Sequence, residues 1–155
     1  MSDTSDCPPE LLAEELQQEL LKFARVAQGQ AYVPYSKFPV GAAVLDEHGK
    51  IHTGCNVENA SYPLGTCAES GALSAMVLAG GRQVRAVLVV GDGEALVTPC
   101  GGCRQKLREF AAADLPVLVA DRQHIRHWFT MGELLPSSFG PDNLAMTREP
   151  NGPAG

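Results

Sequence analysis

The amino-acid sequence predicts one domain of the three-layer α/β/α class, in which helices cover both faces of a single sheet. The main observation is that segments with the period of a strand alternate with segments with the period of a helix. No repeat, low-complexity tract or linker divides the 155 residues. Because 45% of the residues are apolar, a chain of this length can bury a sizeable core and needs no disulfides to fold.

The N-terminal region should contain a polar arm followed by an amphipathic helix. Residues 1–9 end in Pro8-Pro9 and are expected to be flexible. The helix should begin at about Glu10 and stop at Gly29, because apolar residues recur on one helical face between them. These apolar residues are Leu12, Leu16, Leu20, Phe23, Ala24 and Ala27.

A loop and a β-hairpin are expected next. Residues 32–39 are rich in aromatic rings and proline, so they should form an ordered loop whose rings either meet a ligand or partner or cap the core. Residues 40–45 and 50–58 have the pattern of two strands joined by a turn over residues 46–49. Gly54 leaves room for another segment to approach this hairpin closely.

Four polar residues of the predicted hairpin are candidates for a functional role. Asn56 and Glu58 are two residues apart and would share one face of the second strand, where an amide and a carboxylate suit the vicinal hydroxyls of a sugar. The alternative for this pair is a solvated strand end. His48 and His52 lie in or beside the turn, and we expect both to be surface residues.

Two later helices are predicted to begin at cysteines. Residues 59–66 should form a loop that leads to Cys67, and the helix that begins there should end at Gly80-Gly81. Residues 86–90 are apolar throughout and predict a buried strand. After a glycine-rich turn, Cys100 should open the next helix.

The C-terminal third should complete the sheet. Residues 115–120 and 125–130 predict two further strands, which brings the sheet to about five. Residues 134–141 are too apolar for an idle tail and should contact a neighbouring surface. Residues 144–155 are expected to be disordered, which leaves residues 10–143 as the folded domain.

Three cysteines and one glutamate predict a catalytic zinc site. Cys100 and Cys103 follow a proline and enclose two glycines, and Cys67 stands two residues before Glu69. A structural zinc site normally has four protein ligands, whereas a catalytic site keeps three and leaves the fourth position to water. Glu69 would take a proton from that water, so that hydroxide attacks an sp² carbon, and return it to the departing nitrogen or oxygen.

Helix N-termini suit such a site electrostatically. Three thiolates around Zn²⁺ carry a net charge of about −1, and the positive ends of two helix dipoles should lower the thiol pKa values and offset that charge. Two other readings stay open. Cys55 or His52 as a fourth ligand would give a non-enzymatic structural zinc module, and Cys100 with Cys103 alone would suit a redox pair.

Composition excludes several classes of partner. The formal net charge of −6 opposes binding to nucleic acid, which depends on clustered lysine and arginine. No basic start followed by an apolar core precedes the domain, and no apolar run approaches the length of a membrane span, so we expect neither secretion nor membrane insertion. Five cysteines without dense spacing favour a reducing compartment, and therefore the cytoplasm.

Several motifs resemble one known family. They are YSKFPVGA at residues 35–42, NVENA at 56–60, CAE at 67–69, PCGGCRQ at 99–105 and LLPSSF at 134–139. These motifs are similar to those of the small, homotetrameric, zinc-dependent cytidine deaminases, and the likeness runs from about Tyr32 to Leu144. The resemblance implies that family's α/β/α fold with a mixed, roughly five-stranded sheet.

The resemblance also implies an activity. Cys67, Cys100 and Cys103 would bind one zinc ion per subunit, and Glu69 would transfer protons during hydrolysis of cytidine or deoxycytidine to uridine or deoxyuridine plus ammonia, a step of pyrimidine salvage. Glu58 would repel a 5′-phosphate, which favours free nucleosides over nucleotides or polymers.

Substrate contacts within one subunit follow from the same motifs. By the resemblance, Phe38 would stack on the base, Asn56 and Glu58 would hold the ribose 3′-hydroxyl, and the backbone at Ala68 would bind the base.

Other contacts would cross between subunits of the homotetramer. Ala60 and Tyr62 would reach into an adjoining subunit's site, and Phe139 would come from another neighbour.

One position departs from the family pattern. Many members place an arginine directly after the catalytic glutamate, where it bonds the zinc thiolates, and this chain has Ser70 there. Arg104 is the nearest basic residue in sequence and is our candidate for the missing charge, beside the helix dipoles. Ser70 also agrees with a second reading, a deaminase of an aminoacyl-nucleoside antibiotic, since such enzymes lack that arginine too.

Overall fold

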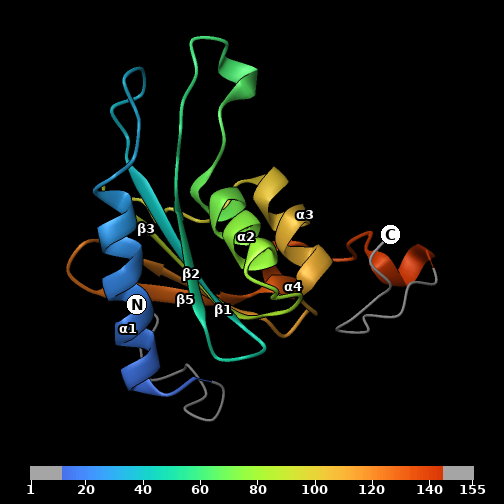
Figure 1. Cartoon of the computed structure of the whole chain (residues 1–155). Helices are drawn as coiled ribbons and strands as arrows, with labels where there is room; N and C mark the ends of the chain where they lie inside the picture. The colour runs from blue at the N-terminus through green and yellow to red at the C-terminus, as the bar shows by residue number, and fades with distance from the viewer. Residues whose placement is uncertain (1–11, 145–155) are drawn as a thin grey trace.

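The computed structural model describes residues 12–144, which form a five-stranded sheet with helices on both faces (Figure 1). The strand order is β2-β1-β3-β4-β5; β3 and β4 are parallel and every other neighbouring pair is antiparallel. The strands are β1 Val40–Asp46, β2 Ile51–Cys55, β3 Val84–Gly91, β4 Pro116–Ala120 and β5 Ile125–Thr130. The α-helices are α1 Glu14–Gln28, α2 Ala68–Leu78, α3 Gly101–Phe110 and α4 Met131–Leu134, and the short 3₁₀ helices are η2 Tyr62–Leu64 and η3 Pro141–Leu144.

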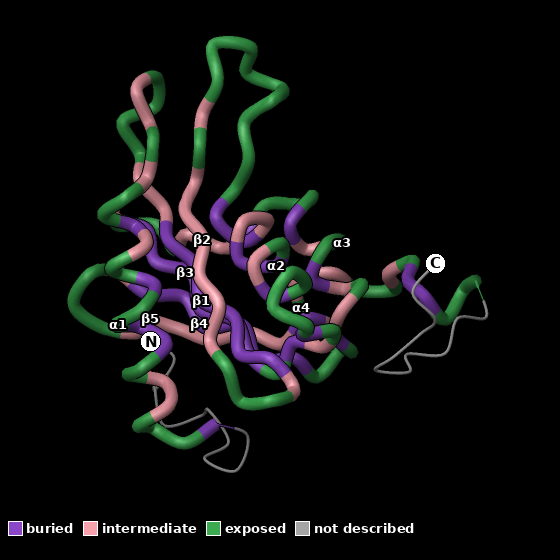
Figure 2. The backbone as a smooth tube through the Cα atoms, in the orientation of Figure 1, coloured by how far each residue is buried: buried purple, intermediate pink, exposed green. Residues whose placement is uncertain are grey.

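Two apolar clusters hold the three layers together. One lies between the sheet and helices α2, α3 and α4, and the other lies between the opposite face of the sheet and α1. In Figure 2 the buried stretches run through the central strands and along the helix sides that face them. The predicted three-layer α/β/α class and the mixed five-stranded sheet are therefore confirmed. None of the described helices is long and apolar enough to cross a membrane.

Helix α1 is shorter than predicted at its start. The prediction placed its beginning at about Glu10, whereas Ala13 has the extended backbone of a cap residue and Glu14 is the first helical residue. Glu14 and Glu15 then occupy the first turn, where carboxylates interact favourably with the helix dipole. The predicted end is right, since the helix closes at Gln28 with Gly29 as its C-cap.

Strand β2 ends at Cys55, three residues before the predicted end. At Asn56 side-chain bonds join a last backbone bond to β1: its backbone N–H donates to the carbonyl of Val40, its amide oxygen accepts from the N–H of Val40 at 2.9 Å, and its amide nitrogen donates to the carbonyl of Phe38 at 2.9 Å. The predicted strand to Glu58 is therefore too long, although the side chains of Asn56 and Glu58 both turn toward the loop that precedes β1. The chain instead leaves the sheet and makes a long projecting excursion before α2 (Figure 1).

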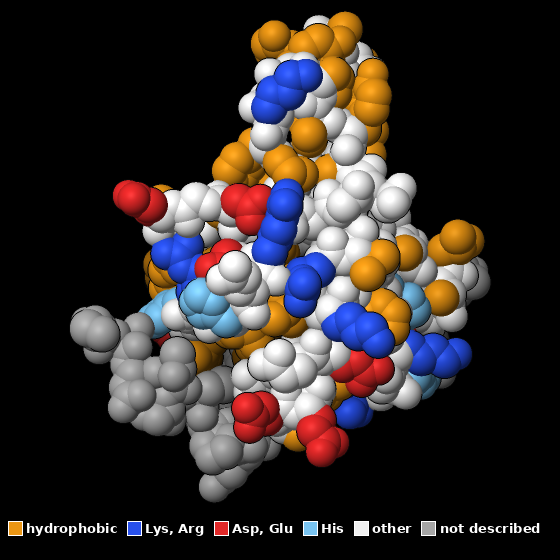
Figure 3. Space-filling model, turned by 90° about the vertical axis from the view of Figure 1, so that its left-hand side faces the viewer, with side chains coloured by type: hydrophobic (Ala, Val, Ile, Leu, Met, Phe, Trp, Pro, Cys, Tyr) orange, Lys and Arg blue, Asp and Glu red, His pale blue; other side chains and the backbone are white. Residues whose placement is uncertain are grey.

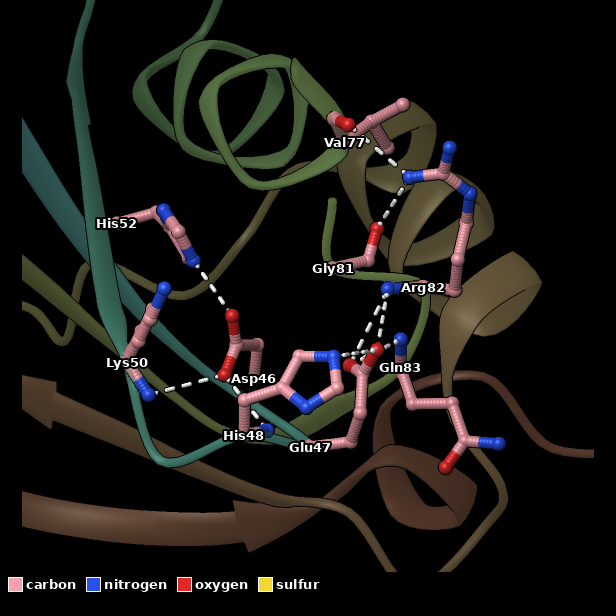
Figure 4. A network of polar contacts seen from close by, with 9 residues as sticks. All are labelled: Asp46, Glu47, His48, Lys50, His52, Val77, Gly81, Arg82 and Gln83. Carbon is pink, nitrogen blue, oxygen red and sulfur yellow. Dashed lines mark hydrogen bonds and ion pairs between the residues drawn. The ribbon is translucent and has the colours of Figure 1, made fainter. Parts of the chain in front are cut away.

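A second prediction, on the histidines of the hairpin turn, also needs correction. His52 was expected at the surface, but its side chain is only 9% exposed and its Nε2 lies 2.7 Å from Oδ2 of the buried Asp46. The other oxygen of Asp46 accepts from the backbone N–H groups of His48 and Lys50 and closes the turn (Figure 4). His48 is exposed, as predicted.

The end of the described chain combines partly buried and exposed residues. Within residues 134–141, Leu134 and Leu135 are partly buried and pack against the core cluster beside α2 and α3. Phe139, by contrast, is 59% exposed. Leu144, where the disordered tail was predicted to begin, belongs to η3. The predicted arm at residues 1–9 and the rest of the predicted tail lie outside the described residues.

Candidate metal centre and active site

Two helix N-termini carry the cysteines and the glutamate. Cys67 is the N-cap of α2 and Cys100 is the N-cap of α3, both with extended backbone, as the motif analysis predicted. Glu69 lies in the first turn of α2, and Cys103 lies in the first turn of α3. Because α2 and α3 pack beside each other on one face of the sheet, the two motifs meet.

The three sulfur atoms fit a tetrahedral zinc ion. The Sγ atoms of Cys67, Cys100 and Cys103 all lie within 4.8 Å of one another, and those of Cys67 and Cys100 are 3.7 Å apart. Two sulfurs at the usual Zn–S distance from a tetrahedral ion lie about 3.8 Å apart. These three sulfurs therefore suit a zinc ion as the cofactor. Residues 12–144 contain one such group of ligands.

No fourth protein ligand completes the set among residues 12–144. The cluster of metal-binding side chains contains neither Cys55 nor His52, and His52 is engaged with Asp46. The alternative of a closed structural zinc module therefore lacks its fourth ligand in the described chain, and the three-ligand set matches a catalytic centre.

Burial opposes the effect of the helix ends on two of the three thiols. Burial and the neighbouring Cys100 raise the pKa of Cys67, and burial together with the Glu69 carboxylate raises the pKa of Cys103. Burial also acts against ionisation of Cys100, but hydrogen bonds from Cys103 and Cys67 outweigh it and lower the pKa of Cys100. The expected lowering thus holds for Cys100 alone, so a divalent cation is needed to offset three thiolates held together.

Glu69 is the buried acid of the site. Glu69 is only 4% exposed. Burial raises its pKa, and a hydrogen bond with Cys103 and the charge of Lys106 offset part of that increase. A carboxyl group with a raised pKa accepts a proton more readily at neutral pH, as a proton-transfer residue must.

A cavity of about 350 Å³ opens beside the metal ligands. Its wall includes Asn56, Glu58, Tyr62, Ala68, Glu69 and Cys100. The wall also contains apolar residues that the sequence analysis did not assign to the site, Val89 within β3 and Val97 before the Pro-Cys motif. The available signal was that the buried strand runs directly toward the segment that leads to Cys100. Phe38, Ala60 and Phe139 do not contribute to this wall within the single subunit.

Asn56 and Glu58 both hold the loop that carries Phe38. Besides the bonds of Asn56 to Phe38 and Val40, Oε1 of Glu58 accepts from the backbone N–H groups of Tyr35 and Ser36, each at 3.0 Å. Hydrogen bonds from the side chain and backbone of Ser36, followed by that from the backbone of Tyr35, lower the pKa of Glu58. The two side chains therefore hold the loop that carries Phe38 beside the cavity.

Arg104 does not bond the thiolates, contrary to our expectation. Its guanidinium donates to the carbonyls of Pro99 and Leu134 at 2.7 and 2.8 Å and to the hydroxyl of Thr98. These acceptors lie just before Cys100 and at the end of α4, so the long side chain is drawn away from the sulfurs. It anchors the segment that presents Cys100. Ser70 instead accepts a hydrogen bond from Lys106, a residue that the sequence analysis did not single out.

An α/β/α domain that joins three thiols and a buried glutamate at two helix N-termini defines a zinc-dependent enzyme of the hydrolase class. Residues 14–119 match the family model described as the cytidine and deoxycytidylate deaminase zinc-binding region. The chain belongs to this cytidine and deoxycytidylate deaminase family.

Individual relatives agree with this assignment. The chain is 42% identical over 132 residues to a cytidine deaminase of Sporosarcina psychrophila, an alignment that covers 85% of this chain and 97% of the relative. Among solved structures, a cytidine deaminase from Burkholderia pseudomallei is similar with a TM-score of 0.73 at 42% identity, over 79% of this chain and 98% of that one. The cytidine deaminase from Mycobacterium tuberculosis gives a TM-score of 0.70 at 40% identity, over 80% and 97%.

Proposed function

We propose that this enzyme hydrolyses cytidine and deoxycytidine to uridine and deoxyuridine with release of ammonia. The observation that carries the proposal is the convergence of three sulfurs and the buried Glu69 on one cavity. Relatives that are named cytidine deaminases, and that this chain matches over nearly their whole length, supply the substrate class.

We assign two roles near the zinc site: the cysteines bind the metal and Glu69 transfers protons. Cys67, Cys100 and Cys103 hold the zinc ion, which when bound makes a water molecule acidic enough to act as a nucleophile at neutral pH. Glu69 accepts a proton from the nucleophile and delivers it to the departing amine. Its burial supports this role, because a carboxyl group shielded from bulk water exchanges its proton with the bound reactant.

The proposed nucleoside contacts line the same cavity as the metal ligands and Glu69. Asn56 and Glu58 face the ribose, and the backbone at Ala68 faces the base; all three line the cavity. Phe38, which is 42% exposed and lies in the loop that Asn56 holds, stacks on the base. The ionised Glu58 and the net charge of −6 disfavour a 5′-phosphate or a nucleic acid, so free nucleosides are the proposed substrates.

We further propose a homotetramer in which the sites are shared between subunits. Tyr62 is 75% exposed and Phe139 is 59% exposed, and hydrophobic side chains gather on the projecting end of the molecule in Figure 3. An apolar patch of this kind supports burial against another copy. Ala60 and Tyr62 on the projecting excursion would then enter an adjoining site, with Phe139 entering from a different neighbour.

A second candidate function keeps the same chemistry with another nucleoside. The serine at position 70 supports a deaminase of an aminoacyl-nucleoside antibiotic, as the sequence analysis noted. The proposed setting of the main function is pyrimidine salvage in the cytoplasm, which the free thiols of Cys55, Cys67, Cys100 and Cys103 support.

One assay separates these functions. Purified protein with measured zinc content is offered cytidine, deoxycytidine, cytosine, adenosine and an aminoacyl-nucleoside antibiotic, and loss of the amino group is followed by absorbance. We expect turnover of cytidine and deoxycytidine. Turnover of the antibiotic alone would select the second function, and zinc-replete protein inert to all five compounds would refute both.

A further inference from the structure

A lysine and a serine connect the two helices that carry the metal ligands. Lys106 lies three residues after Cys103 on α3, and Ser70 lies three residues after Cys67 on α2. Residues at this spacing lie on neighbouring positions of one helix face. The ammonium of Lys106 donates a hydrogen bond to the hydroxyl of Ser70 across the gap between the helices. The bond thus places a cation one helical turn from both motifs.

Lys106 forms no ion pair with a carboxylate among the described residues. Arg104, the other cation near the motif, donates to carbonyls and a hydroxyl instead. Because its hydrogen-bond partner Ser70 directly follows Glu69 in the first part of α2, the ammonium of Lys106 is held beside the start of the helix that carries Cys67 and Glu69.

We propose that Lys106, held in place by Ser70, is a positioning residue whose positive charge stabilises the zinc–thiolate centre. This role rests on the proposed zinc site formed by Cys67, Cys100 and Cys103. Zinc binding converts three neutral thiols into three thiolates around a dication, so the charge of the centre falls from 0 to about −1 as three protons leave. A fixed cation nearby favours the bound, negatively charged form.

The expected size of the effect is modest because Lys106 is exposed to solvent. Charges near a protein surface interact weakly and are screened by salt. We therefore expect loss of the charge to weaken zinc binding by roughly two- to tenfold at low ionic strength. The difference should shrink in concentrated salt, where the Debye length falls to about 3 Å. A packing role would show no such dependence.

The test measures zinc affinity by competition with a chelator, at low and at high salt. Lys106→Met removes the charge and keeps most of the aliphatic stem, whereas Lys106→Arg keeps the charge. Lys22→Met is the matched control, since Lys22 is exposed on α1 at the opposite face of the sheet. We expect weaker binding in Lys106→Met only, near-native binding in Lys106→Arg, and a smaller loss in Ser70→Ala.

The outcomes are distinguishable. Equal affinity in Lys106→Met and Lys22→Met would overturn the proposal, as would a loss in Lys106→Met that Arg does not rescue or that salt does not reduce. If Lys106→Met fails to fold, Lys106→Gln is measured in its place under the same criteria. Wild-type protein that binds no zinc would refute the proposed function itself, a result separate from any difference among the variants.

Discussion

The backbone of Gly54 in β2 lies directly against the first turn of α2. A Cβ atom at this position would lie 2.3 Å from the carbonyl oxygen of Ala68, far inside contact distance. Glycine is therefore required for α2 to pack at this depth. Since Cys67 and Glu69 flank Ala68, the contact fixes the height at which both approach the cavity.

Gly54→Ala should push α2 outward. We expect a loss of about 1–3 kcal/mol in the free energy of unfolding, the usual cost of overpacking, and a larger relative loss of turnover because Glu69 moves with the helix. Chemical denaturation and kinetics would measure the two effects. Gly29→Ala is the control, because the nearest atom to its new Cβ lies at an ordinary 3.4 Å. Native behaviour of Gly54→Ala would contradict the packing argument.

Glu69→Gln should separate metal binding from catalysis. The amide has nearly the same shape and leaves the three sulfurs in place, so zinc stoichiometry should stay at the wild-type value. Without a proton acceptor, turnover should fall by about 10²–10⁴. Metal analysis and steady-state kinetics on one sample check both parts. Comparable turnover in the variant would remove Glu69 from the mechanism.

Cys67→Ala should abolish zinc binding and the stability linked to it. For wild-type protein, zinc at a thousandfold above its Kd should add about 4 kcal/mol to the free energy of unfolding, and the variant should show no such gain. Cys55→Ala is the control, since Cys55 is a free thiol outside the cluster. The comparison needs denaturation curves with and without added zinc. A zinc-dependent gain in Cys67→Ala would revise the ligand set.

Asp46 should make the hairpin sensitive to acid. Burial alone would raise its pKa, but the hydrogen bonds from His52 and from the backbone of Lys50 and His48 prevail, so the pKa of Asp46 is below its ordinary value of 3.8. A depressed pKa contributes stability that is complete above the unfolded-state value and disappears as pH falls through the folded-state value. The stability advantage of wild type over Asp46→Asn should therefore be constant near neutral pH, begin to decrease as pH approaches the ordinary value of 3.8, and disappear only below the lowered folded-state pKa.

Denaturant unfolding of the two proteins at several pH values would measure this difference. An advantage that persists unchanged at the lowest pH would mean that the carboxylate charge contributes nothing and that shape alone matters.

Glu58→Ala should loosen the loop over residues 32–39 even in the absence of substrate. The change removes the acceptor for the N–H groups of Tyr35 and Ser36, so limited proteolysis should cut this loop faster and KM should rise. Glu58→Gln keeps one acceptor oxygen and should leave proteolysis near the wild-type rate while still raising KM. Equal protection of the loop in all three proteins would refute the bracing role.

The sequence allowed the layers and the metal ligands to be predicted because both are encoded locally. Strand and helix periods survive in single segments, and Cys100 with Cys103 is a short motif whose spacing fits one helical turn. The end of β2 was missed because hydrophobic alternation carries no sign that the backbone beyond Cys55 leaves β1 and pairs with Tyr32 and Thr66 instead.

Long side chains and cross-strand partners account for the other errors. His52 looked like a turn residue, yet the antiparallel register of β1 and β2 brings it to Asp46, six positions away. Adjacency to Cys103 suggested that Arg104 serves the thiolates, but free carbonyls at Pro99 and Leu134 hold the guanidinium. Lys106 was overlooked because its importance depends on how α2 and α3 pack.

The separation of the ligands along the chain gives the metal a mechanical consequence. Cys67 and Cys100 are 33 positions apart, and a shared ion would fasten the starts of α2 and α3 like a removable cross-link. Closing a loop of this length restricts the unfolded chain. Without zinc the protein would therefore lose folding stability as well as activity. Its lifetime in a cell would then depend on the zinc concentration.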